Sequence, residues 1–199
     1  MQIIVVSNSL SKRIEYFIEA GKHLQTEVRF MTYGELFNCL PQLRQAVIKL
    51  EPCVSDETDF QKYALLNQAY KETLQRLGEM RLSDDVCFLN TPHALLRALD
   101  KKDTKQVLVD RGLRVTPMLP SPHSFDELRE LLAGCGRGCF LKPRYGSGAG
   151  GIMAIRYQPN RNKWVVYTTL RQVDGVIHNT KRINRLSVEK EIIPLALSS

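Results

Sequence analysis

The sequence predicts an α/β protein, with an open parallel α/β sheet in the first part of the chain and an α+β part with an antiparallel sheet after it. Three observations support this fold class. A strand, a helix and a second strand follow one another within residues 2–32, the order of a parallel sheet. A glycine-rich loop after residues 139–143 is followed by a strand rather than a helix, and Asp174-Gly175 is typical of a two-residue hairpin turn.

The opening segment carries the clearest succession of elements. Residues 2–6 are mostly aliphatic and predict a buried strand, and a cap-rich turn at 7–9 precedes apolar residues at helical spacing up to Gly21. Residues 28–32 alternate as a second strand does, and residues 34–40 predict a short helix that the following proline ends. This segment therefore predicts the start of a parallel sheet.

The middle of the chain continues with helices and one strand. A helix follows the polar loop at 51–57, and residues 86–89 predict the next strand. One face of the helix is marked by Leu66, Tyr70, Leu74 and Leu77. Pro92 is expected to begin a further helix, and Asp100 to cap the one after it, which Gly112 ends.

A proline-rich connector at 116–122 leads into the second part. Beyond it we expect a helix at 125–132, strands at 139–143, 152–157, 164–173 and 176–178, and a last helix at 187–197. Because short turns join the later strands, their pairing is predicted to be antiparallel.

The composition is that of an ordinary globular protein, with 199 residues of which 43% are hydrophobic and 25% charged. It excludes disordered, collagenous and fibrous chains. The longest aliphatic run, residues 3–6, is too short to cross a bilayer or to form the core of a signal sequence. We therefore expect a cytoplasmic protein that does not enter the membrane.

The formal charge of +7 lies in the second half of the chain. Residues 1–98 carry 11 basic against 12 acidic side chains, whereas residues 99–199 carry 17 against 9. Such an excess suits a nucleotide, a nucleic acid or a solvated surface, and charge alone does not choose among them.

Five cysteines without a framework spacing and four scattered histidines predict neither a disulfide scaffold nor a Cys/His metal site.

Residues 142–151, Lys-Pro-Arg-Tyr-Gly-Ser-Gly-Ala-Gly-Gly, form the most informative segment. Its glycines satisfy the dinucleotide-binding pattern GxGxxG, but a strand follows where that fold requires a helix, and the Walker and kinase patterns fail as well. What remains is a hairpin whose small residues let backbone N–H groups approach an anion, with Lys142 ending the strand before it. The alternative is a plain β-hairpin with a glycine turn.

Two motifs resemble the ATP-grasp superfamily, the fold of D-alanine ligase, biotin carboxylase and many carboxylate-amine ligases. Residues 88–92, followed by Asp100-Lys101 and then by residues 112–117, are similar to the family's entry segment, whose lysine reaches the ATP phosphates. Residues 139–143 and 146–151 are similar to its second phosphate lysine and its glycine-rich flap.

The resemblance implies two domains. Residues 1–89 would be the α/β domain that precedes the ATP-grasp core, and residues 90–199 a partial ATP-grasp domain with helices and the glycine-rich flap, incomplete at the C-terminus. In this family ATP phosphorylates a substrate carboxylate, and an amine, thiol or other nucleophile then displaces phosphate from the acyl phosphate. Lysines and magnesium stabilise the charge on the transferring phosphoryl group.

The resemblance also implies which residues bind ATP. They are Lys101, Lys142, Arg144, Gly146, Ser147, Gly148, Ala149, Gly150 and Gly151. Lys102 and Lys105 compete with Lys101 for its role, and Arg144 either adds a phosphate contact or shields the strand end. Without the resemblance, the three lysines of the 101–105 segment are a solvated basic helix face. The family's adenine strand and acidic Mg²⁺ ligands are not found, so those ligands are expected beyond this chain, and we expect no ligase turnover from this chain alone.

Two other functions stay open. One is a non-catalytic nucleotide-binding or interaction module that keeps the flap without the metal site. The other is nucleic-acid binding by the basic residues Arg156, Arg161, Lys163, Arg171, Lys181, Arg182 and Arg185 with Trp164 and Tyr167, which no recognisable motif accompanies. The carboxylate and nucleophile substrates cannot be read from the sequence. A homo-oligomer is also open, because a half-built core would leave apolar surface exposed.

Overall fold

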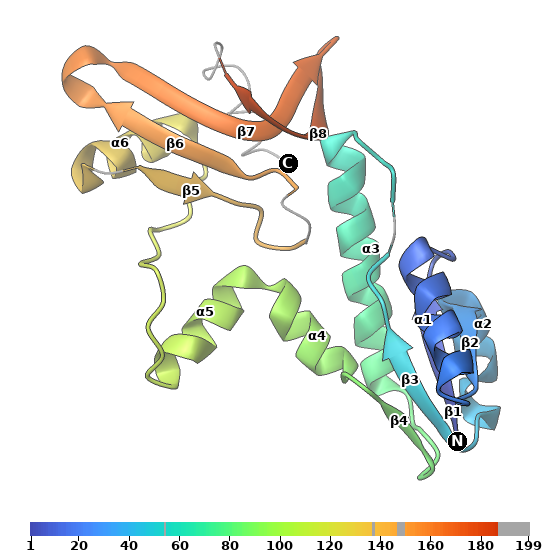
Figure 1. The fold of residues 1–199 in the computed structure, drawn as a ribbon. Helices are drawn as coiled ribbons and strands as arrows, with labels where there is room; N and C mark the ends of the chain where they lie inside the picture. The colour runs from blue at the N-terminus through green and yellow to red at the C-terminus, as the bar shows by residue number, and fades with distance from the viewer. Residues whose placement is uncertain (54, 137, 147–149, 187–199) are drawn as a thin grey trace. The chain divides into compact units, whose positions relative to one another are not determined.

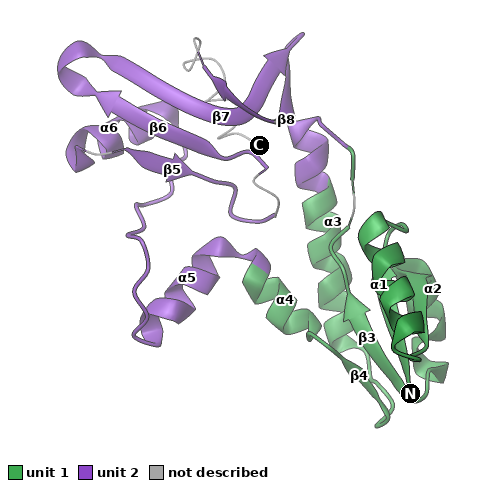
Figure 2. Cartoon of the chain, viewed as in Figure 1, with its two compact units in different colours: residues 1–56, 66–98 green, residues 57–65, 99–199 purple. Residues whose placement is uncertain are grey.

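The computed structural model describes residues 1–186 except 54, 137 and 147–149 (Figure 1). The chain forms two compact units, shown in different colours in Figure 2. The first contains residues 1–56 and 66–98, and the second contains residues 57–65 together with the chain from residue 99 onward. The predicted domains 1–89 and 90–199 stay predictions, and the helix predicted at 187–197 lies outside the described residues.

The first unit is built on a parallel sheet in the order β2-β1-β3-β4. Its strands are β1 (Gln2–Ser7), β2 (Val28–Thr32), β3 (Ala46–Leu50) and β4 (Val86–Phe88). Its helical segments are α1 (Lys12–His23), α2 (Tyr33–Cys39), the 3-10 turn η1 (Leu40–Gln42), most of α3 (Phe60–Glu79) and most of α4 (Pro92–Leu99).

Helix α1 begins later than the cap-rich turn at 7–9 suggests. Ser11 is its N-cap, and the Ser11 hydroxyl accepts a hydrogen bond from the Ile14 backbone N–H. Helix α2 has a full capping box, in which Thr32 and Glu35 each accept from the other's backbone N–H. Local side-chain hydrogen bonds therefore fix where both helices start.

Strand β3 is the element for which the sequence analysis made no prediction. Its alternate residues Ala46, Ile48 and Leu50 are buried, and Lys49 lies half-buried between the last two. The strand pairs in parallel with β1 along its whole length and with β4 over three residues. Val47 and Ile48 are β-branched and the buried residues alternate, so the segment has a strand signal of its own, and pairing with β1 and β4 completes the strand.

The long helix α3 confirms most of the predicted apolar face within the first unit. Tyr70, Leu74 and Leu77 are buried, and the Tyr70 ring meets Tyr33 edge-on at 5.9 Å between centroids. Leu66, which the spacing placed on this face, is exposed. The buried face of α3 in this unit therefore begins after Leu66.

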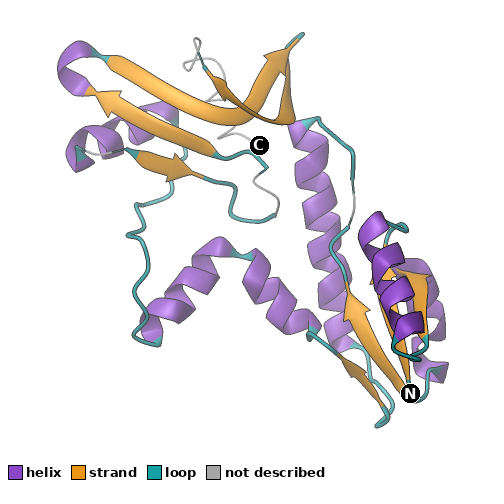
Figure 3. Ribbon diagram, in the orientation of Figure 1, coloured by secondary structure: helices purple, strands orange, loops and turns teal. Residues whose placement is uncertain are grey.

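The second unit is built on an antiparallel sheet in the order β5-β6-β7-β8, drawn in orange in Figure 3. Its strands are β5 (Cys139–Leu141), β6 (Met153–Gln158), β7 (Lys163–Val173) and β8 (Val176–Arg185). Its helices are α5 (Lys101–Asp110) and α6 (Phe125–Cys135), and the 3-10 turn η2 (Pro159–Arg161) joins β6 to β7. The predicted mixed α/β fold, with one parallel and one antiparallel sheet, is confirmed at this level.

Alternation along β7 separates the two faces of the antiparallel sheet. Trp164, Val166 and Leu170 are buried, whereas Tyr167 and Arg171 point to the opposite face and are exposed. The buried set packs with side chains from β6, β8, α6 and the start of α3 in one cluster: Phe60, Leu128, Leu132, Met153, Ile155 and Ile177. One face of this sheet therefore carries the core of the second unit.

The turns of the second unit follow from residues that tolerate positive φ. Asp174 and Gly175 have φ of 49° and 78° between β7 and β8, which is the hairpin predicted from this pair. Gly136, with φ of 59°, ends α6.

None of the described helices combines the length and the apolar content that crossing a membrane requires.

We expect Ile48→Ala to lower the free energy of unfolding of the first unit by about 2–4 kcal/mol, because Ile48 is fully buried at the centre of the parallel sheet. Urea unfolding followed by far-UV circular dichroism measures the change. Leu24→Ala is the matched control, since Leu24 is 76% exposed, and it should change stability by less than about 0.5 kcal/mol. Equal effects of the two variants would contradict the central position of β3.

Candidate functional site

The Asp100 side chain links the start of α5 to Arg144, which lies three residues after the end of β5. Its carboxylate caps α5 by accepting from the backbone N–H groups of Lys102 and Asp103 at 3.0 and 3.1 Å. The same carboxylate accepts two hydrogen bonds from Arg144 Nε at 2.9 Å and one from Nη2 at 2.6 Å. One side chain thus holds two segments that are 44 residues apart in the sequence.

The electrostatics of this pair follow from its hydrogen bonds. Those from Arg144 hold the pKa of the Asp100 carboxyl well below its ordinary value, against the opposing effect of burial. The same interaction raises the pKa of the Arg144 guanidinium. The pair is therefore ionised throughout the neutral range.

Lys101 lies at the first glycine of the loop. Its backbone N–H donates to the Arg144 carbonyl at 3.1 Å, and its Nζ donates to the Gly146 carbonyl at 2.8 Å. With the ion pair of Asp100 and Arg144, these contacts fix residues 144–146 against the N-terminus of α5. Residues 100–101 and 144–146, which belong to the two motifs that are similar to ATP-grasp sequences, therefore lie together.

Lys142 places a second ammonium group near Lys101. Burial lowers the pKa of the Lys101 ammonium, the positive charge of Lys142 lowers it further, and Asp100 acts in the opposite direction. Lys142 itself is exposed, with Nζ 5.3 Å from the centroid of the Phe140 ring. Two ammonium groups therefore lie within electrostatic range of each other at the start of the loop.

The glycine-rich loop is constrained at both of its described ends. Gly146 and Gly151 have φ of 105° and 70°, a backbone conformation that side chains disfavour. A Cβ on Gly151 would lie 2.4 Å from Phe60 Cε2, and one on Gly150 would lie 2.9 Å from Tyr63 Cε1. The loop therefore returns closely packed against the first turns of α3, while Ser147, Gly148 and Ala149 lie outside the described residues.

The other lysines of this region occupy different surroundings. Lys105 Nζ donates to the Thr116 Oγ1 and carbonyl at 2.7 and 3.2 Å, which ties α5 to the proline-rich connector. Lys102 is exposed, and its backbone N–H is one of the two that donate to Asp100. Of the three competing lysines, the geometry brings Lys101 to the glycine-rich loop.

The aromatic side chains considered for nucleic-acid binding differ in exposure. Trp164 is 7% exposed, with its ring 4.9 Å from Phe125 and 4.4 Å from Tyr157 between centroids, so it is a core residue. Tyr167 is exposed on the other face of the sheet. Base stacking on Trp164 would require the core to open, which weakens this alternative.

Three contributions to the site were missed by the sequence analysis. Asp100 was recognised only as a helix cap, because nothing local marks its pairing with Arg144. Phe60 and Tyr63 belong to a helix whose predicted face began at Leu66.

Within the described part of the chain, no group of three or more His, Cys, Asp or Glu side chains is arranged to hold a metal ion.

We expect the ion pair of Asp100 with Arg144 to make the free energy of unfolding fall more steeply as the pH is lowered. An unfolded Asp titrates near pH 4 and the folded group well below, so this stabilisation is present above about pH 4 and is lost as the pH falls toward the folded value. Asp100→Asn keeps a capping residue and removes the charge. Between pH 5 and pH 3 the variant should therefore lose less stability than the parent.

Urea unfolding followed by fluorescence of Trp164, the single tryptophan, measures this in the second unit. Asp100→Ala is the companion variant, and it should cost a further 0.5–2 kcal/mol, roughly, at neutral pH because the cap is lost as well. Parallel pH profiles for the parent and Asp100→Asn would show that the ion pair contributes nothing.

We expect Gly151→Ala to destabilise the second unit by at least about 2 kcal/mol, because its φ is positive and its Cβ would overlap the Phe60 ring. Gly134→Ala is the same chemical change inside α6, with open space around the new Cβ, and should stabilise by about 0.5–1 kcal/mol. The Trp164 unfolding transition reports both. A neutral Gly151→Ala would mean that the loop does not pack on Phe60.

Comparison with known proteins adds no assignment, since no family model matches the chain and no curated protein is significantly similar to it.

Proposed function

We propose that the second unit binds Mg-ATP, with Lys101 and Lys142 neutralising phosphate charge and the loop 146–151 covering the β- and γ-phosphates. The observation that carries this proposal is the hydrogen bond of 2.8 Å from Lys101 Nζ to the Gly146 carbonyl, in the electrostatic range of Lys142. It joins a cation on a helix to a glycine-rich loop, the two parts that triphosphate recognition needs.

Each part of the site has a separate role in the proposal. The ammonium groups supply the positive charge, and the glycine backbone supplies N–H groups that no side chain shields. The Asp100–Arg144 pair would position Lys101 and the start of the loop, and Arg144 would either add a phosphate contact or shield the strand end. Bound magnesium would supply further positive charge at the phosphates.

The reaction proposed is that of an ATP-grasp ligase, of which this chain supplies the ATP-binding portion without completing the reaction alone. A substrate carboxylate oxygen attacks the γ-phosphorus of ATP and ADP leaves, which yields an acyl phosphate. A nucleophile such as an amine then attacks the acyl carbon and releases inorganic phosphate. Lys101 and Lys142 would act in the first step, because negative charge on the transferring phosphoryl group is stabilised by fixed cations.

We expect the chain to bind Mg-ATP in isothermal titration calorimetry. Lys142→Ala and Lys101→Ala should each weaken binding by roughly 10- to 100-fold, the loss for one charge-assisted hydrogen bond. A non-hydrolysable ATP analogue should behave in the same way, since the proposal at this stage concerns binding.

Lys163→Ala is the matched control, because Lys163 is an exposed lysine of the same unit that pairs with Gln158, at the far end of β6 from the loop. It removes the same charge and should leave the affinity unchanged. The proposal is wrong if the parent does not bind Mg-ATP, or if all three variants lose affinity equally. Circular dichroism establishes that each variant is folded.

A further inference from the structure

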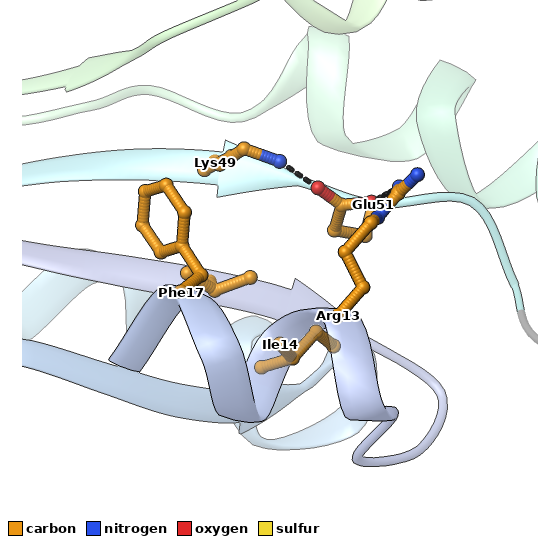
Figure 4. A pocket seen from close by; sticks show the side chains of 6 residues that line it. Arg13, Ile14, Phe17, Lys49 and Glu51 are labelled. Atoms are coloured by element: carbon orange, nitrogen blue, oxygen red, sulfur yellow. Dashed lines mark ion pairs between the residues drawn. The ribbon is translucent and has the colours of Figure 1, made fainter. Parts of the chain in front are cut away.

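A separate pocket lies within the first unit, at the end of the parallel sheet. It has a volume of about 330 Å³. Its lining residues, of which Figure 4 labels all but the first, are Val5, Arg13, Ile14, Phe17, Lys49 and Glu51. They come from β1, from α1 and from β3 with the residue that follows it.

The topology makes this a natural place for a ligand. In the order β2-β1-β3-β4 the chain leaves β1 to form β2 on one side and later forms β3 on the other. The connections therefore diverge between β1 and β3, where Val5 and Lys49 are partners in the register. Open parallel sheets bind ligands in the crevice at the carboxyl ends of the strands at this position. Glu51 directly follows β3, and Arg13 lies in the first turn of α1.

A buried carboxylate organises the charges of the pocket. Glu51 is 5% exposed, and its two oxygens form ion pairs with Lys49 and Arg13, which reach it from two sides in Figure 4. Its backbone is also fixed, because its N–H donates to the Val6 carbonyl at 2.8 Å and its carbonyl accepts from the Tyr33 hydroxyl at 2.5 Å. Two cations around one carboxylate leave an excess of one positive charge.

Stability alone does not explain this cluster. Taking a carboxylate and its partners out of water costs about as much as their attraction returns, so an apolar set of the same volume would serve the fold equally well. The cations also differ in exposure, since the Arg13 side chain is 72% exposed and that of Lys49 is 24% exposed. Glu51 thus holds one cation at the bottom of the pocket and one at its opening.

Arg13 is the group best placed to meet a ligand. It contacts Glu51 through Nη2, and its side chain is 72% exposed, so a ligand at the opening of the pocket can reach the guanidinium. An arginine fork binds carboxylates and phosphates through two parallel hydrogen bonds. The remaining lining of the pocket is apolar, since it consists of Val5, Ile14 and Phe17. Val5 and Ile14 are buried, and the centroid of the Phe17 ring lies 5.5 Å from Lys49 Nζ.

We infer that this pocket binds a small organic monocarboxylate with an apolar or aromatic tail. The carboxylate would pair with Arg13 and Lys49, and the tail would contact Phe17 and Ile14. A single negative charge matches the excess of one positive charge, whereas a phosphomonoester would bring close to two. This inference is independent of ATP binding by the second unit.

The test uses 3-phenylpropionate as the probe and 3-phenylpropylamine as its cationic match in ¹H–¹⁵N NMR titrations of the whole chain. We expect saturable shifts of amides around Val5, Arg13 and Glu51 with the carboxylate, at a dissociation constant of millimolar order or lower, and none with the amine. Acetate should bind at least about tenfold more weakly, because it lacks the tail.

Arg13→Gln should weaken binding of 3-phenylpropionate by about tenfold or more. Lys12→Gln is the control, since it removes one positive charge from the neighbouring exposed position of α1 and should leave binding unchanged. Spectra of the free variants establish that the sheet is intact. The inference is overturned if pocket amides show no saturable shift up to concentrations on the order of 10 mM, if the amine binds equally well, or if the two variants behave alike.

Discussion

The Asp100 carboxylate is the group on which the candidate phosphate site depends. It satisfies two N–H groups at the start of α5 and at the same time binds the Arg144 guanidinium through Nε and Nη2. Because a carboxylate has four lone-pair directions, one buried side chain can serve a helix end and an ion pair together. The position of Lys101 follows, since its own N–H bonds to the Arg144 carbonyl and its Nζ then reaches Gly146.

The cations of the two candidate sites differ in whether a carboxylate lies between them. In the first unit, Arg13 and Lys49 share the buried carboxylate of Glu51, and the excess is a single charge. In the second unit, burial lowers the pKa of the Lys101 ammonium, and the positive charge of Lys142 lowers it further against the effect of Asp100. This difference in charge is the basis on which we propose a monoanion for the first unit and a multiply charged phosphate for the second.

Much of the fold could be predicted because many of its signals are local. The Asp174-Gly175 turn and the cap at Asp100 each depend on hydrogen bonds or dihedral angles within a few residues. Strand β3 was missed although its signal is local as well, since Val47 and Ile48 are β-branched and buried residues alternate along the segment. The Glu51 pocket could not be predicted, because it exists only where β3 lies beside β1.

The sequence by itself determined the class of fold, the starts of several helices and the candidate residues of the phosphate site. Only the tertiary structure decided which of the neighbouring lysines meets the loop: Lys101 lies beside Gly146, 45 residues away, while Lys105 bonds to Thr116. The physical reason is the range of the interactions. Helical and turn hydrogen bonds join residues close in sequence, but an ion pair such as that of Asp100 with Arg144 forms only after folding has brought distant segments together.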